Sequence, residues 1–292
     1  MARKTAKLWL LALCCSGTAA ARLEPSFYLD YCAWHATDIV VVIPAGSATQ
    51  FRVAEVIAGS VAVGRVLELQ GLASSVDNSR RLSHLIGDWW KPEGRFEGTP
   101  PIREGDRIIV FLKNIDQRWE PALGIGTILT SAIWIQDGEL FVYEQTPPWS
   151  TNLVRYWFPE GKSEAQVCGE IDEVRKLRGA LGTAVRLADP RERTRRLLDL
   201  AHSNEAAPGG SFAQYAAVEA LAAGGPSEAK ALLRLLREAT RAWRTTCAGS
   251  HSLANSLIQS ITSRHGNQLQ SEAGKLGDSR RACSKPAGHP RQ

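Results

Sequence analysis

The sequence predicts an α+β protein in which a small β-barrel or sandwich is followed by an α-helical region. Between residues 26 and 158 the chain is rich in β-branched and aromatic residues and holds seven of its nine tryptophans. From Ser163 onward Ala, Leu, Arg and Glu dominate, and strand-like runs disappear. Because the apolar period changes there from two to 3.6, we expect a β domain over residues 22–160 and a helical region over 161–264.

Six short runs in the first part have the composition of strands. Two of them, 38–43 (DIVVVI) and 107–112 (RIIVFL), are almost entirely apolar, whereas 50–57 (QFRVAEVI) alternates. Asp137-Gly138 separates the last two runs and predicts a hairpin turn, because this dipeptide tolerates left-handed backbone. Strands at this spacing indicate a barrel or a sandwich. The other expected strands are 64–69, 130–135 and 139–145.

Two segments of the first part stand apart from the strands. Residues 28–36 form a short helix or an extended segment that carries Cys32 and His35. The polar stretch 72–101 is too long for an ordinary connection and contains the adjacent indoles Trp89 and Trp90. Exposed neighbouring indoles are costly unless they pack or bind. They are interpreted either as a binding surface or as a plug for one end of the barrel.

The first part also resembles a known module. A cysteine is followed by ATDIVVV, by FRVAEVIAGSVAVGRVLEL and by REGDRIIVFLKN. This order resembles the netrin-like, tissue-inhibitor-of-metalloproteinase-like modules, which have an OB-type fold, and is similar to uncharacterised bacterial extracytoplasmic proteins with this layout. The inhibitors of that family use a cysteine at the mature N-terminus to chelate zinc. After the expected cleavage of residues 1–21 the mature chain begins at Arg22, so Cys32 does not stand at its N-terminus. The resemblance therefore implies an OB-like fold without inhibitory chemistry.

Helix signals fill the second part. Ser163 is expected to cap a helix whose apolar face includes Val167, Ile171, Val174 and Leu181. Asp189-Pro190 begins the next helix. The segment 211–243 resembles one HEAT-type helical hairpin, with a Gly-Pro turn between its helices. Since a repeat array needs about three units, a HEAT-like array and a generic bundle both remain open.

The ends of the chain indicate export. Residues 1–21 combine basic residues, an apolar run and small residues up to Ala21, the layout of a secretory signal. We expect cleavage there, a mature chain beginning at Arg22, and an extracytoplasmic location, periplasmic or secreted. No later stretch is long enough to span a membrane. The polar, basic segment 265–292 is expected to be a disordered tail.

Charge and cysteines narrow the function classes. The net charge of +5 is too small and too spread out to indicate nucleic-acid binding. After cleavage four cysteines remain, which permits two disulfides in three connectivities, and buried free thiols are the alternative. These cysteines are Cys32, Cys168, Cys247 and Cys283.

Motifs for chemistry are absent from the sequence. It contains no G-x-S-x-G, no H-E-x-x-H, no phosphate loop and no C-x-x-C pair. The nearest metal-like cluster is Cys32, His35 and Asp38, which falls short of the ligand set that zinc requires. We therefore predict neither catalytic residues nor a cofactor nor a metal.

The sequence as a whole favours an exported, non-enzymatic binding or interaction protein. Its partner is expected to be a protein of the cell envelope or the extracellular space, not a nucleic acid, and Trp89 and Trp90 are the candidate binding surface. The alternative is an exported hydrolase of unfamiliar type that uses residues near Cys32, His35 and the Trp89-Trp90 loop.

Overall fold

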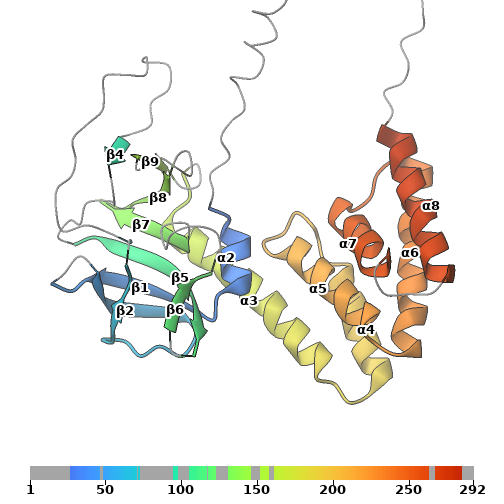
Figure 1. Cartoon of the computed structure of the whole chain (residues 1–292), viewed down its shortest axis with the longest axis horizontal. Helices are drawn as coiled ribbons and strands as arrows, with labels where there is room; N and C mark the ends of the chain where they lie inside the picture. The colour runs from blue at the N-terminus through green and yellow to red at the C-terminus, as the bar shows by residue number, and fades with distance from the viewer. Residues whose placement is uncertain are drawn as a thin grey trace, which may run out of the picture.

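The computed structural model describes residues 27–46, 49–70, 72, 95–97, 105–116, 118–122, 131–145, 152–157, 161–262 and 267–284. In these residues the short helix α2 (Leu29–His35) precedes an antiparallel sheet of nine strands, and six longer helices follow it. The predicted α+β class is therefore confirmed. In Figure 1 the sheet lies on the left and most of the helices on the right, with α2 between them.

The strands follow the order β3-β2-β1-β5-β7-β8-β9-β4, and β6 pairs with β5. The hairpin predicted at Asp137-Gly138 is confirmed. It joins β7 to β8, and the two residues have φ values of 54° and 82°. The strands are β1 (Asp38–Pro44), β2 (Gln50–Ala58), β3 (Val66–Glu68), β4 (Arg95–Glu97), β5 (Arg107–Ile115), β6 (Arg118–Pro121), β7 (Ala132–Gln136), β8 (Glu139–Gln145) and β9 (Asn152–Trp157).

The central strands are buried on both faces. Along β1, Ile39 and Val41 belong to a core shared with the helices, whereas Val40 and Val42 belong to a second core on the opposite face. β5, β7 and β8 alternate between the two cores in the same way. This explains why the sequences of β1 and β5 are almost continuously apolar, because a strand covered on both sides has no position for a solvated side chain.

The described strands form an open sheet, whereas the sequence predicted a barrel or sandwich. β3 and β4 lie at the two ends of the strand order, and each pairs with one described strand. A closed barrel would need a pairing between such edge strands. The second core gathers side chains from six strands around the fully buried Trp134. The described strands therefore line this core as an open sheet.

The helices begin where the capping signals predict. The Ser163 hydroxyl accepts a hydrogen bond from the Gln166 N–H at 3.3 Å, and the Gln166 side chain accepts one from the Ser163 N–H at 2.8 Å. This reciprocal pair is a capping box. The Asp189 carboxylate caps the next helix through the Arg191 N–H at 2.9 Å. The helices are α3 (Glu164–Val185), α4 (Pro190–Ala201), α5 (Gly210–Ala222), α6 (Pro226–Thr246), α7 (His251–Thr262) and α8 (Asn267–Ser284).

These six helices pack as three consecutive pairs. α3 packs on α4, α5 on α6, and α7 on α8. In addition, α5 contacts α3 and α7, while α6 contacts α4 and α8. The first helices of the pairs thus lie together in one layer and the second helices in another, as in stacked helical hairpins. The hairpin predicted over residues 211–243 corresponds to α5 and α6.

A continuous core joins the sheet to the helices through α2. Cys32 and Ala33 of this helix are fully buried in the core that also contains residues of β1, β5 and every longer helix. Just before α2, the Phe27 ring lies 5.8 Å from the ring of Phe111 on β5. The two parts of the chain are therefore connected by packing as well as by sequence.

Polar groups hold α2 at both ends. The Asp30 carboxylate accepts a hydrogen bond from the N–H of Gly209, which precedes α5, at 2.8 Å. The carbonyl of Ala36, at the end of α2, accepts hydrogen bonds from Arg175 at 2.7 Å and from Arg178, both on α3. Cationic donors at a helix C-terminus satisfy carbonyl groups that have no partner within the helix.

The prediction of a disordered tail from residue 265 is wrong for Asn267–Ser284, which form α8. Ala273, Leu276 and Ser279 of this helix are buried, and α8 packs on α6 and α7. Cys283 is bonded to Cys247, the residue at the end of α6. This segment folds as a helix with few apolar residues because neighbouring helices and a covalent bond hold it in place.

The turn after β2 depends on Asp38. This buried carboxylate accepts hydrogen bonds from the N–H groups of Ser60 at 2.7 Å and Val61 at 3.2 Å, and from the Thr37 hydroxyl at 2.8 Å. Gly59 has a φ of +114°, and a Cβ at this position would lie 2.3 Å from Asp38 Oδ1. Position 59 therefore requires glycine for both conformation and space.

We expect Gly59→Ala to lower the free energy of unfolding by about 3 kcal/mol, because displacement of a buried hydrogen-bonded carboxylate adds to backbone strain. Gly64→Ala is the matched control. Its φ is +84°, but no atom lies within 4 Å of the added Cβ, so backbone strain alone costs about 1–2 kcal/mol. Urea unfolding measures both variants, and equal losses would contradict the role assigned to Asp38.

The disulfide should make a large contribution to stability. For the 36-residue separation of Cys247 and Cys283, the chain-entropy relation gives about 3–4 kcal/mol. We expect Cys247→Ser/Cys283→Ser to lower the melting temperature and to expose α8 to protease. Cys168→Ser, at a free and half-buried thiol, is the control and should melt like the wild type. Identical melting of the wild type with and without dithiothreitol would show that the bond stabilises nothing.

Candidate interaction surface

Cys32 lies in the core, in surroundings that disfavour its thiolate form. Its side chain is fully buried on α2. Burial raises the pKa of its thiol to about 12, although hydrogen bonds involving Ser131 and Tyr28 lower it in part. Thiolate is the reactive form of cysteine, so this residue is chemically inert in the folded protein.

His35 and Asp38, the other members of the predicted cluster, face different environments. The half-buried His35 ring lies 4.3 Å from the ring of Tyr31, and burial together with the charges of Lys113 and Arg178 lowers its pKa. Asp38 is already engaged by the turn after β2. Across the described residues, no group of three His, Cys, Asp or Glu side chains is arranged to hold a metal ion.

We expect Cys32 to resist iodoacetamide at pH 8 in the folded protein and to react after unfolding, because its pKa of about 12 leaves almost no thiolate. Peptide mass spectrometry after timed alkylation measures the modification. Cys168 is the internal comparison, since its thiol is half-buried and its pKa is raised by burial and by Glu164. Rapid labelling of native Cys32 would restore the hydrolase interpretation.

The predicted binding surface, Trp89 and Trp90, lies outside the described residues. Within them, the most distinctive surface is on α6. Its basic side chains recur at spacings of four, three, four and three residues, which place them along one face of the helix. All are exposed, and they span about 21 Å along the helix axis. This basic ridge consists of Lys230, Arg234, Arg237, Arg241 and Arg244.

Most cations of the basic ridge have no carboxylate partner. Arg234 pairs with Glu238 at 2.8 Å, and Arg244 donates a hydrogen bond to the Ser279 hydroxyl at 3.1 Å. Within the described chain, neither Lys230 nor Arg237 nor Arg241 forms an ion pair. Arg237 and Arg244 are nevertheless near enough to Glu272 on α8 to help Lys275 lower the pKa of that carboxyl.

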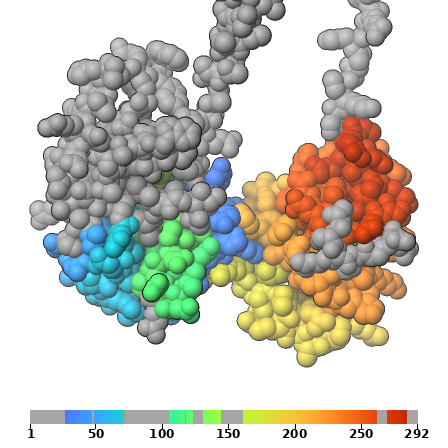
Figure 2. Space-filling model, in the orientation of Figure 1, coloured from blue at the N-terminus to red at the C-terminus, as the bar shows by residue number. Residues whose placement is uncertain are grey.

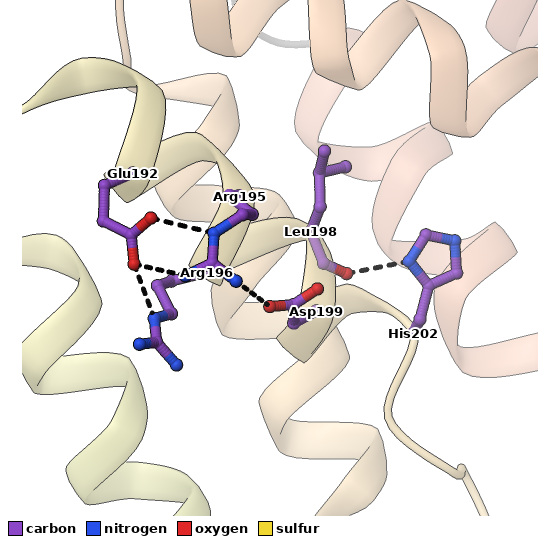
Figure 3. A network of polar contacts seen from close by, with 6 residues as sticks. All are labelled: Glu192, Arg195, Arg196, Leu198, Asp199 and His202. Carbon is purple, nitrogen blue, oxygen red and sulfur yellow. Dashed lines mark hydrogen bonds and ion pairs between the residues drawn. The ribbon is translucent and has the colours of Figure 1, made fainter.

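The neighbouring helix α4 carries four arginines, but three of them are already paired. Arg195 and Arg196 both donate to Glu192, as Figure 3 shows, and their hydrogen bonds lower the pKa of that carboxyl to about 2. Arg195 also lies 3.8 Å from Asp199. Arg193 turns inward and pairs with Glu228 at 2.7 Å.

On α8, which also packs on α6, a lysine and an arginine are likewise paired with carboxylates. Lys275 pairs with Glu272 at 2.9 Å and Arg281 with Asp278 at 2.6 Å. Arg280 lies over the Trp243 ring at 5.5 Å. Figure 2 shows α8 in red lying against the orange helices, including α6, on the surface of the helical region. On α4 only Arg191 has no ion pair among the described residues, so cations without a carboxylate partner are more numerous along the basic ridge than on α4.

The basic ridge also lacks apolar anchors. Among the described residues, exposed large hydrophobic side chains occur on the sheet, near α2 and on α3 and α5, but not on α4, α6 or α8. No described helix has the length and hydropathy of a membrane span. The exposed hydrophobic residues are Tyr28, Val63, Val66, Ile115, Val185 and Tyr215.

The chain was compared with protein-family models, curated proteins and solved structures, and none of them matches it. The interpretation of the surface therefore rests on its own geometry. The sequence already contains the four-three-four-three spacing of the basic ridge, on the side of this segment opposite its leucines. What the sequence does not show is which arginines are neutralised, because the pairing of Arg193 depends on the packing of α4 on α6.

Proposed function

We propose that the protein is an exported, non-enzymatic interaction protein that binds an acidic partner through the basic ridge of α6. The observation that carries this proposal is the line of five exposed cations, four of which have no ion-pair partner in the described residues. Unpaired surface cations attract an anionic partner at long range, and their electrostatic energy falls when that partner binds.

Export is supported by two independent features. The first 21 residues have the three-part layout of a secretory signal. The second feature is the Cys247–Cys283 disulfide, because disulfides form and persist in oxidising compartments. We therefore place the protein in the periplasm or outside the cell, where its partner is a component of the envelope or the extracellular space.

The architecture supports binding as well. An open antiparallel sheet is compatible with the OB-like domain that the netrin-like resemblance implies, and three stacked helix pairs are compatible with a HEAT-like array. Such arrays present extended surfaces to partners. The alternative hydrolase has no observation in its favour among the described residues, since Cys32 is buried and its thiol is protonated.

We expect Arg237→Gln/Arg241→Gln to weaken retention on a carboxylate cation-exchange resin, so that this variant elutes at lower salt than the wild type. Arg195→Gln/Arg196→Gln loses the same two charges from arginines already paired with Glu192, and it should elute closer to the wild type. Circular dichroism confirms that both variants are folded. Equal shifts in elution would mean that net charge alone determines binding and would contradict the proposed surface.

A further inference from the structure

The cations of the basic ridge, of which only Arg234 is paired with a carboxylate in the described residues, are arranged in one dimension. Five cations follow one another along α6 at an average spacing of about 5 Å, which is 3.5 residues of helix. The arginines and lysine of α4 and α8 that are paired with carboxylates contribute little net charge beside it. A narrow line of positive charge can contact an extended polyanion along its whole length. A flat anionic surface would touch this line over only a small part of its area.

A lipid bilayer fits this surface poorly. Peripheral membrane helices combine basic residues with apolar side chains that enter the headgroup region. Among the described residues of α4, α6 and α8 there is no exposed large hydrophobic side chain, and on α5, which also contacts α6, the exposed one is Tyr215. A bilayer would therefore contact the ridge through charge alone and along a single line.

A folded protein and a single-stranded nucleic acid fit poorly for a related reason. The hot spots of protein interfaces combine arginine with large aromatic anchors such as Trp and Tyr. Single-stranded nucleic acids are held by aromatic side chains on which bases stack. The only aromatic residue of α6 is Trp243, and it is 5% exposed and covered by Arg280 and His251.

We infer that the acidic partner is a linear acidic polysaccharide that lies along the basic ridge, an inference that rests on the proposed function. Such a polymer repeats carboxylate or sulfate groups along an extended chain and has no bases to stack. Four of the five cations are arginines, whose planar guanidinium groups bind oxyanions in a bidentate manner. Release of counterions from the polymer would supply binding energy without apolar contacts, as it does for other polyanions.

The test uses the full secreted chain and titrates it with polygalacturonate and with heparin, which separate carboxylate from sulfate recognition. Isothermal titration at several salt concentrations gives the affinity and its salt dependence. We expect binding to at least one of the two polymers, with an affinity that rises with oligomer length until the ridge is covered. Arg237→Gln/Arg241→Gln should reduce the slope of log K against log salt by about two, one for each cation removed.

Arg195→Gln/Arg196→Gln is the matched control and should leave that slope close to the wild-type value. A dT20 oligonucleotide and vesicles containing phosphatidylglycerol are the competing ligands, and tighter binding to either one would overturn the inference. If neither polysaccharide binds while retention on the resin still depends on Arg237 and Arg241, the inference fails and the proposed function stands. If that dependence is also lost, both fail.

Discussion

The structure depends on covering the face of the sheet that carries Ile39, Val41 and Phe111. These side chains are fully buried, and they belong to the same core as α2 and the longer helices. An antiparallel sheet can leave one face to solvent, but this one has apolar residues on both. Without α2 and the helices behind it, this face of the sheet would expose a large hydrophobic surface, which folded proteins rarely do. The sheet and the helical region are thus parts of one packed unit.

Three sets of contacts hold α6 in place, one on its inner face and one at each of its ends. Its inner face packs into the core through Leu232, Leu235 and Leu236. Near its first residue, Glu228 is buried: burial acts to raise the pKa of this carboxyl, but hydrogen bonds from Arg193 and from backbone N–H groups lower it overall. At its other end, Cys247 is bonded to α8. With both ends and the inner face held, the outer face can carry cations such as Arg237 and Arg241, which form no ion pair in the described residues.

The arginines of the helical region serve two purposes that composition does not distinguish. Some are structural: Arg175 and Arg178 hold the end of α2, and Arg193 neutralises a buried carboxylate. Others remain unpaired at the surface, as Arg237 and Arg241 do in the described chain. A net charge of +5 over 292 residues conceals this division. The candidate surface is therefore defined by how the charges are distributed and not by their number.

Local signals in the sequence were enough to predict the α+β class, the helix starts at Ser163 and Asp189-Pro190, and the hairpin at Asp137-Gly138, because these depend on local backbone preferences and short-range hydrogen bonds. Tertiary contacts were needed to establish that the described sheet is open, that Asn267–Ser284 form a helix, that Cys247 pairs with Cys283, and which cations have no ion pair in the described residues. Each of these depends on contacts between residues far apart in the chain, for which a single sequence holds no local signal.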